Sequence, residues 1–218
     1  PMDPVVAPTW DEMDACIEAL KGWQQRVAVL LRFTGLRVQQ VMGLRWDDVD
    51  MRAGVLTIRG ELGKSTSERR GRRMPMSPHL VALLRLWPRD EEEPWLVVTT
   101  RMKGGRYERV ARGRDVGRGW ERSGVREDAW RRRPNHAFRK GYISGLKRAG
   151  ADPDAVEFLV GHSLGLRGVY IDPDALPLTT VVGLVPRLNS MALEAVLEQF
   201  DAGVRFEGLD LRGRGPVR

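Results

Sequence analysis

The chain has 218 residues, 42% of them hydrophobic, which suffices for one globular domain with a real core or for a small pair of domains. No apolar run approaches the roughly 18 residues of a membrane-spanning helix, and the first residues lack the pattern of a signal peptide, so we expect a cytoplasmic protein without a membrane partner. The net charge of +7 and the pI near 10.1 favour a polyanionic partner, first of all nucleic acid, although the dominance of Arg over Lys is also typical of a GC-rich genome.

The first part of the chain predicts three successive helices. Thr9-Trp-Asp-Glu12 is a capping box that opens a helix through about Leu20. A second helix with apolar residues at helical spacing runs to Thr34 and ends at Gly35, and a short helix follows over 37–44. The single cysteine, Cys16, lies in the first helical pattern, so we expect a buried, unreactive thiol and no disulfide within the chain.

The middle of the chain predicts a small hairpin at the edge of an otherwise helical body. Two short apolar segments flank a polar loop and are expected to pair, at 55–58 and 73–76. The pattern between residues 88 and 134 is weak. Before residue 134 we also expect an exit into the sheet at 46–50, a helix at 78–87, a strand at 95–99 and a helix at 114–122.

The last third returns to clear helical patterns. Apolar residues at helical spacing predict helices over 136–149, 152–160, 178–185 and 191–200. We therefore expect a mainly α fold with a small antiparallel β-sheet, built as one domain over 1–200. The segment 201–218 is expected to be a basic tail rich in Gly and Arg.

Charged residues scattered along the chain could together hold a phosphodiester. Arg37 and Arg139 carry guanidinium forks that match phosphate oxygens and do not deprotonate. His136 lies three residues before Arg139, so both share one face of a helix. His162 follows a glycine that ends a helix, and Tyr170, eight residues later, is a possible nucleophile. Cleaving a nucleic acid strand without a metal requires this combination of cations, proton donor and nucleophile.

Four motifs carry a resemblance to a known family. They are Thr34-Gly-Leu-Arg37 with Leu44-Arg-Trp-Asp47 behind it, His136-Ala-Phe-Arg139, Leu159-Val-Gly-His162, and Tyr170 in Val-Tyr-Ile-Asp-Pro-Asp. This set resembles the catalytic domain of the tyrosine recombinases, the phage integrase family, with its DNA breaking-rejoining fold. The resemblance implies an enzyme that cuts and rejoins DNA through a 3′-phosphotyrosine. In it, Tyr170 would be the nucleophile, Arg37 and Arg139 the phosphate clamp, and His136 and His162 further catalytic residues.

Two positions depart from the family pattern or fit it less closely. The family has a lysine on a hairpin turn that protonates the leaving 5′ oxygen, and the resemblance gives this role to Lys64, although the loop before Pro75 is longer than usual. The family also usually has a carboxylate three residues after the first arginine, where this chain has Gln40. Since Gln still forms hydrogen bonds, we expect altered tuning rather than loss.

The resemblance also predicts partners and biological setting. It implies double-stranded DNA as substrate, self-association on DNA as a tetramer in synapsis with a monomer possible when free, and integration or excision of a phage or mobile element. It begins near Trp10, so the N-terminal core-binding domain of many members is expected to be missing. The helix over 191–200 is expected either to pack in the same chain or to be exchanged with a neighbour. Further DNA contacts are expected from Arg72, Arg73, Arg131, Arg132, Arg133 and Lys140.

Other functions and other residues also fit parts of this pattern. A type IB topoisomerase uses a similar residue set, and a catalytically silent DNA-binding relative would keep the fold. Tyr107 and Tyr142 are rival tyrosines, of which Tyr142 is expected in the core. Gly63-Lys-Ser-Thr66 resembles the end of a P-loop but lacks its first glycine. Three distant histidines form no metal site, so no metal or organic cofactor is expected.

Overall fold

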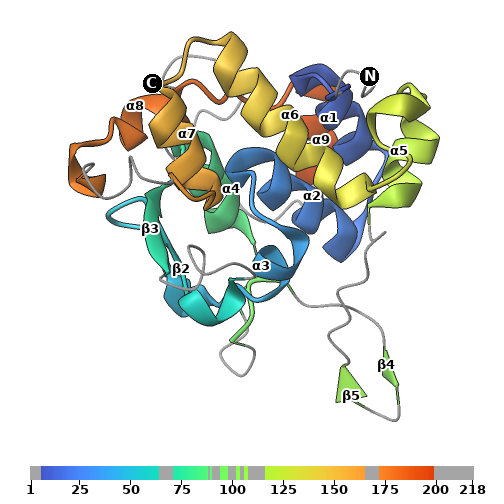
Figure 1. Ribbon diagram of the computed structural model, residues 1–218. Coiled ribbons are helices and arrows are strands. Elements are labelled where there is room, and N and C mark those ends of the chain that lie inside the picture. The colour runs from blue at the N-terminus through green and yellow to red at the C-terminus, as the bar shows by residue number, and fades with distance from the viewer. Residues whose placement is uncertain are drawn as a thin grey trace, which may run out of the picture.

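A computed structural model describes residues 6–63, 71–87, 89, 94–97, 102–103, 106–107, 116–164 and 172–198. The described chain is mostly helical, with a three-stranded antiparallel sheet at one edge of the helical body (Figure 1). The predicted fold class is therefore confirmed. The expected tail at 201–218 lies outside the described residues.

The first three helices form close to where the sequence predicts them. They are α1 (Trp10–Glu18), α2 (Gly22–Thr34) and α3 (Val38–Met42). Thr9 Oγ1 accepts a hydrogen bond from the Glu12 amide while Glu12 Oε2 accepts one from the Thr9 amide, so the capping box is confirmed. Gly35 ends α2 with a φ of 61°, a left-handed conformation that favours glycine. Arg37 is the residue before α3 and has extended backbone.

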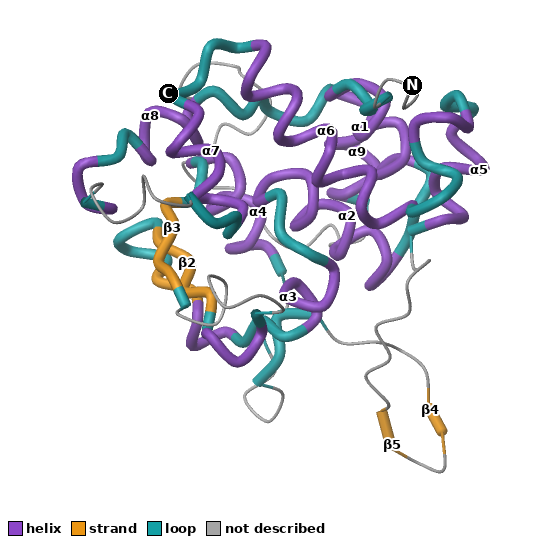
Figure 2. The backbone as a smooth tube through the Cα atoms, in the orientation of Figure 1, coloured by secondary structure: helices purple, strands orange, loops and turns teal. Residues whose placement is uncertain are grey.

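The sheet has one strand more than the predicted hairpin. Its strands are β1 (Val49–Asp50), β2 (Val55–Ile58) and β3 (Arg72–Pro75), in that order. In the β2–β3 register Leu56 pairs with Met74, and both are buried. Because side chains alternate along a strand, Arg72 shares the face of buried Met74 whereas the exposed Arg73 faces the other way. A separate two-stranded ribbon, β4 (Met102–Lys103) and β5 (Arg106–Tyr107), was not predicted (Figure 2).

The remaining helices follow the predicted pattern with small shifts at their ends. They are α4 (Pro78–Leu86), α5 (Gly117–Ser123), α6 (Pro134–Arg148), α7 (Pro153–Val160), α8 (Leu178–Gly183) and α9 (Ser190–Leu197). The helix α6 begins two residues before the predicted start, because Pro134 suits the first turn, where its missing N–H needs no acceptor. Of the predicted strand at 95–99, Trp95 forms an isolated bridge to Arg45, and 98–99 lie outside the described residues.

The core is shared by α1, α2 and α6, which pack side by side. Glycine allows α6 to approach α1 closely, since a Cβ added at Gly145 would lie 2.5 Å from Trp10 Cε2. Phe138 and Trp120 fill the space between α6 and α5, with ring centroids 4.8 Å apart. Cys16 is fully buried, and burial raises the pKa of its thiol, so the expectation of a buried cysteine is confirmed.

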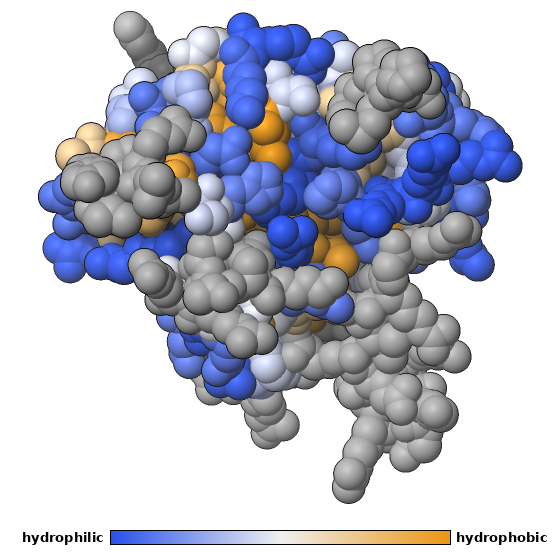
Figure 3. Space-filling model, viewed as in Figure 1, coloured by the Kyte–Doolittle hydropathy of each residue, from blue (hydrophilic) through white to orange (hydrophobic). Residues whose placement is uncertain are grey.

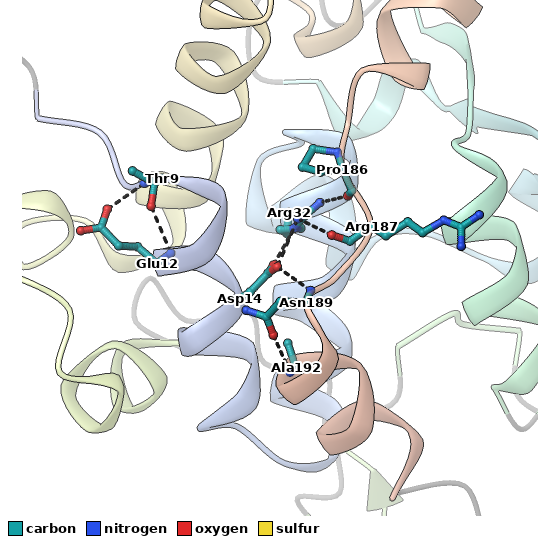
Figure 4. A network of polar contacts seen from close by, with 8 residues as sticks. All are labelled: Thr9, Glu12, Asp14, Arg32, Pro186, Arg187, Asn189 and Ala192. Carbon is teal, nitrogen blue, oxygen red and sulfur yellow. Dashed lines mark hydrogen bonds and ion pairs between the residues drawn. The ribbon is translucent and has the colours of Figure 1, made fainter. Parts of the chain in front are cut away.

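The helix α9 packs on α1 of the same chain, and a buried polar network holds the segment before it (Figure 4). Arg32 Nε lies 2.8 Å from Asp14 Oδ1, and Arg32 Nη1 donates to the Pro186 carbonyl at 2.6 Å. Asp14 Oδ2 accepts a hydrogen bond from the Asn189 amide at 3.0 Å. This arrangement agrees with the first of the two expected placements of the last helix, packing within one chain.

The surface is polar over much of the face that carries α6 and α7, with small apolar areas between hydrophilic side chains (Figure 3). None of the described helices is long and apolar enough to cross a membrane.

Candidate functional site

The turn before Arg37 is bound directly to the helix that carries His136 and Arg139. Arg139 Nη1 donates a hydrogen bond to the carbonyl of Gly35 at 3.0 Å, across 104 positions in sequence. A Cβ at Gly35 would lie 2.4 Å from Tyr142 Cδ1, so only glycine lets α6 approach this turn. Packing of α2 against α6 thus brings the first and second predicted motifs together.

Positive charge is concentrated around His136. Burial, followed by the charges of Arg139, Arg37, Lys140 and Arg133, lowers the pKa of His136 to about 4. These four groups of the described chain are all cations, so Arg37 and Arg139 both lie close enough to act on the same imidazole. His136 is therefore neutral near pH 7, and the surrounding field favours an anion.

Gln40 stabilises the backbone at Arg37. Its Oε1 accepts a hydrogen bond from the Arg37 amide at 3.1 Å, and its side chain is fully buried. The residue lies three positions after the N-cap, where Glu or Gln completes a capping interaction at a helix start. The expectation that Gln40 still forms a hydrogen bond is confirmed.

His162 lies in the turn that ends α7. Gly161 adopts a φ of 76°, and the His162 amide donates to the Glu157 carbonyl at 2.9 Å, as in a Schellman motif. His162 Nδ1 also contacts Glu157 Oε2, and Lys147 Nζ lies 3.3 Å from Glu157 Oε1. Burial alone would raise the pKa of Glu157, but these two hydrogen bonds and the charges of their donors lower it. The carboxylate therefore accepts from Nδ1, which leaves Nε2 as the atom that would meet a ligand.

Arg72 reaches the same turn from the sheet, whereas the other expected DNA contacts lie on the surface. Arg72 Nε donates to the Leu159 carbonyl at 3.1 Å. Lys140 is partly buried near His136. The exposed ones are Arg73, Arg131, Arg132 and Arg133.

The structure describes the side chain of one of the three tyrosines. Tyr142 is fully buried, and burial raises the pKa of its phenol. This confirms the prediction of a core residue and removes Tyr142 as a rival nucleophile. Tyr170 and Lys64 lie outside the described residues, as does the side chain of Tyr107.

Sequence reasoning missed two neighbours of His162. Glu157 lies five residues before it, the spacing at which a Schellman turn closes a helix, and the Gly161-His162 pair could have indicated that contact. No local pattern indicates that Arg72 turns inward, because that depends on the register of β3. Among the described residues there is no group of three or more His, Cys, Asp or Glu that could hold a metal ion.

Comparison with known proteins supplies the family. The model of the phage integrase family matches residues 9–166, which is most of the chain. The chain belongs to the phage integrase family. The family match includes Arg37, His136, Arg139 and His162 and ends four residues before Tyr170.

Curated relatives in this family are tyrosine recombinases. Tyrosine recombinase XerC of Xanthomonas campestris pv. campestris is 29% identical over 147 residues, covering 67% of this chain and 43% of the relative. Tyrosine recombinase XerA of Thermococcus kodakarensis is 30% identical over 143 residues, covering 64% of this chain and 47% of the relative. The chain thus spans less than half the length of these relatives.

Solved structures of family members share the fold. A crystal structure of XerA recombinase has a TM-score of 0.54 at 22% identity and covers 91% of this chain and 65% of that one. An integrase from mycobacterium phage Brujita has a TM-score of 0.55 at 18% identity and covers 90% of this chain and 66% of that one.

Proposed function

We propose that this chain is the catalytic part of a site-specific DNA recombinase that cuts and rejoins strands through a 3′-phosphotyrosine. The observation that carries the proposal is the cluster of Arg37, His136 and Arg139, which the Gly35–Arg139 hydrogen bond assembles. Burial, and after it the charges of these arginines, lowers the pKa of His136 to about 4. Such a field stabilises the charge that builds on a phosphate during cleavage. Family membership supports the same conclusion.

Each residue takes a role that its chemistry permits. Arg37 and Arg139 hold the nonbridging oxygens. His162 donates to the same phosphate through Nε2, which requires a proton on both ring nitrogens because Nδ1 already donates to Glu157. The Tyr170 hydroxyl attacks phosphorus, and the leaving 5′ oxygen takes its proton from Lys64. Arg139 is only 1% exposed, so its direct contact with a phosphate requires the site to open when DNA binds.

A phosphate would also change His136. A phosphate next to Arg37 and Arg139 cancels part of the charge that depresses its pKa. We therefore propose that His136 is neutral in the free protein and gains a proton as the complex forms. A protonated imidazole would then add a positive charge and a second donor to the phosphate site.

The proposed partner is double-stranded DNA, with self-association on it as a tetramer in synapsis. Surface contacts to the phosphate backbone are assigned to Arg73, Arg131, Arg132, Arg133 and Lys140, and binding should weaken steeply with salt. We further propose integration and excision of a phage or mobile element as the setting, in the cytoplasm on the nucleoid. The fold shared with a phage integrase supports this setting.

The decisive experiment compares the wild type with Tyr170→Phe on supercoiled plasmid in EDTA. After a denaturing quench, the wild type is expected to give relaxed DNA and a covalent protein–DNA adduct, and Tyr170→Phe neither. Tyr142→Phe is the matched control, because its fully buried hydroxyl has no hydrogen-bond partner among the described residues.

The outcomes separate the remaining alternatives. An adduct from Tyr142→Phe and none from Tyr170→Phe supports the assigned nucleophile. Binding without any adduct from the wild type would indicate a catalytically silent DNA-binding relative. Relaxation of any plasmid without exchange between sites would indicate a topoisomerase.

A further inference from the structure

Arg72 joins the sheet to the turn that holds His162. Its Nε donates to the carbonyl of Leu159, in the last turn of α7, at 3.1 Å. A Cβ at Gly161 would lie 2.6 Å from Arg72 Nη1 and 2.9 Å from Arg72 Cζ, so the guanidinium lies directly against Gly161. The residue after Gly161 is His162, and any movement of this guanidinium acts on the backbone that carries the imidazole.

We propose that Arg72 is a positioning residue for His162 and not a contact to the DNA backbone. This proposal rests on the proposed function, in which His162 donates to the reacting phosphate. Three observations carry it: the Leu159 hydrogen bond, the close packing on Gly161, and the burial of both terminal nitrogens of Arg72. The terminal nitrogens therefore lie inside, against the turn at the end of α7, and not on the surface where Arg73 is exposed.

The chemistry of the helix end explains why an arginine suits this place. The last carbonyls of a helix have no amide donor within the helix, and the end of the helix dipole is negative. A cation that donates to the Leu159 carbonyl satisfies one such group and interacts favourably with the dipole. Arginine adds a flat surface that fits against a glycine, which an ammonium group on a flexible stem lacks.

Gly161 is fixed by two independent requirements. Its φ of 76° lies in the left-handed region, where side chains are disfavoured, and a Cβ there would also overlap the Arg72 guanidinium. The turn and the arginine therefore constrain each other. Two contacts therefore restrain His162. Glu157 contacts its Nδ1, and the Arg72 guanidinium packs against Gly161, the residue before it.

The neighbouring Arg73 supplies a matched control. It carries the same side chain on the same strand, but it is exposed and points to the other face of the sheet. A role in DNA contact should therefore appear on replacing Arg73, and a role in positioning His162 on replacing Arg72.

The first measurement uses protein without DNA. Amide hydrogen exchange of Gly161 and His162 is compared in the wild type, Arg72→Gln, Arg72→Lys and Arg73→Gln, after thermal unfolding has verified that each variant folds. We expect exchange at these amides to be about tenfold faster in Arg72→Gln, as for loss of a hydrogen bond to a charged donor. Arg73→Gln should match the wild type. Arg72→Lys keeps the positive charge and replaces the Gln variant if that variant fails to fold. Its Gly161 and His162 amides should also exchange faster than those of the wild type.

The second measurement uses DNA cleavage and binding. At saturating DNA, Arg72→Gln should slow adduct formation about tenfold in a His162-containing protein and less than about twofold in a His162→Gln background. Arg73→Gln should reduce the slope of log affinity against log salt by about one, and Arg72→Gln should leave that slope unchanged.

The results that would overturn the proposal are defined for each arm. If Gly161 and His162 exchange in Arg72→Gln at the wild-type rate, Arg72 does not support the His162 turn. If Arg72→Gln reduces the salt slope as far as Arg73→Gln does, Arg72 contacts DNA. The exchange arm needs neither DNA nor activity. If the wild type forms no adduct while exchange responds to Arg72 as expected, the proposed function fails and the support of His162 by Arg72 stands.

Discussion

Two buried arginines of this chain serve opposite purposes. Arg32 and Arg139 are 0% and 1% exposed, and both donate to backbone carbonyls. Arg32 also forms a buried ion pair with Asp14. Arg139 acts instead, together with Arg37, on the imidazole of His136, where the charged groups among the described residues are positive.

The difference shows how the neighbours of a buried charge indicate its role. Moving a guanidinium out of water is costly unless an opposite charge compensates it. At Arg32 the protein supplies that charge from α1 and uses the pair to hold the segment before α9 (Figure 4). Around His136 the described charges of Arg37 and Arg139 gather positive potential, and such a cluster favours the binding of a phosphate.

The largest effect should come from Arg139→Leu, which removes a phosphate-holding cation and leaves the core apolar. We expect adduct formation at saturating DNA to fall by about 10³-fold, comparable to losing a transition-state donor. The free energy of unfolding should stay within about 1 kcal/mol of the wild type, because a lost hydrogen bond is offset by the removal of a buried charge. Single-turnover cleavage and urea unfolding measure the two. A large loss of stability would place Arg139 in the same class as Arg32.

The converse prediction concerns Arg32→Leu. This change leaves Asp14 buried without its cation, so we expect the free energy of unfolding to fall by about 3–5 kcal/mol. The double variant Asp14→Leu with Arg32→Leu should recover part of the loss, although the Asn189 amide then loses its acceptor. Urea unfolding of the two variants tests this. Equal stability of Arg32→Leu and the wild type would show that the ion pair does not hold α9 in place.

The motifs that carry the proposed chemistry were readable in the sequence because they are local. The Gly35 turn before Arg37, the three-residue spacing of His136 and Arg139, and the Gly161 helix end all follow from short-range rules, and each has the predicted local structure. The existence of the helices was likewise set by periodicity. Their ends shifted by a few residues, since capping depends on neighbours such as Pro134 that the apolar pattern does not include.

What could not be predicted depends on contacts between distant segments. The direction of Arg72 follows from the pairing of Leu56 with Met74, which the residues of β3 alone do not specify. The Asp14–Arg32 pair, by contrast, could have been predicted from the sequence around Arg32. Arg32 interrupts an apolar segment of α2 that is buried on all sides, and a charge in such a place requires a partner.

Acid should destabilise the protein through its two neutral histidines. Burial is the first cause that lowers the pKa of both His136 and His79 to about 4, and neighbouring arginines are the second. The unfolded chain takes up these protons near pH 6.5 and the folded chain only near pH 4, so stability falls as pH drops through that window. Each histidine contributes up to about 3 kcal/mol to this loss. Urea unfolding from pH 7.5 to 4 measures it.

Variants separate the two histidines. His79→Gln should flatten the pH dependence and leave DNA cleavage intact, since His79 packs against Phe33 and the charges that act on it are those of Arg187 and Arg32. His136→Gln should flatten it by a similar amount and slow cleavage. Stability that is constant between pH 7 and pH 4.5 in the wild type would contradict the low pKa of both groups.

The smallest effect is expected at Glu157, which orients His162 without touching the phosphate. Glu157→Ala removes the acceptor at Nδ1, so the imidazole is expected to turn more freely, to sample both tautomers and to present Nε2 to the phosphate less often. Adduct formation should slow about tenfold, a loss typical for removing one hydrogen bond to a charged group. Glu157→Gln keeps an acceptor oxygen and should slow it less than about threefold. Long-range nitrogen spectra of the imidazole rings report the tautomer without DNA. If Glu157→Ala leaves both the tautomer and the cleavage rate unchanged, His162 is oriented by its backbone turn alone, and the support from Arg72 becomes the main restraint on its position.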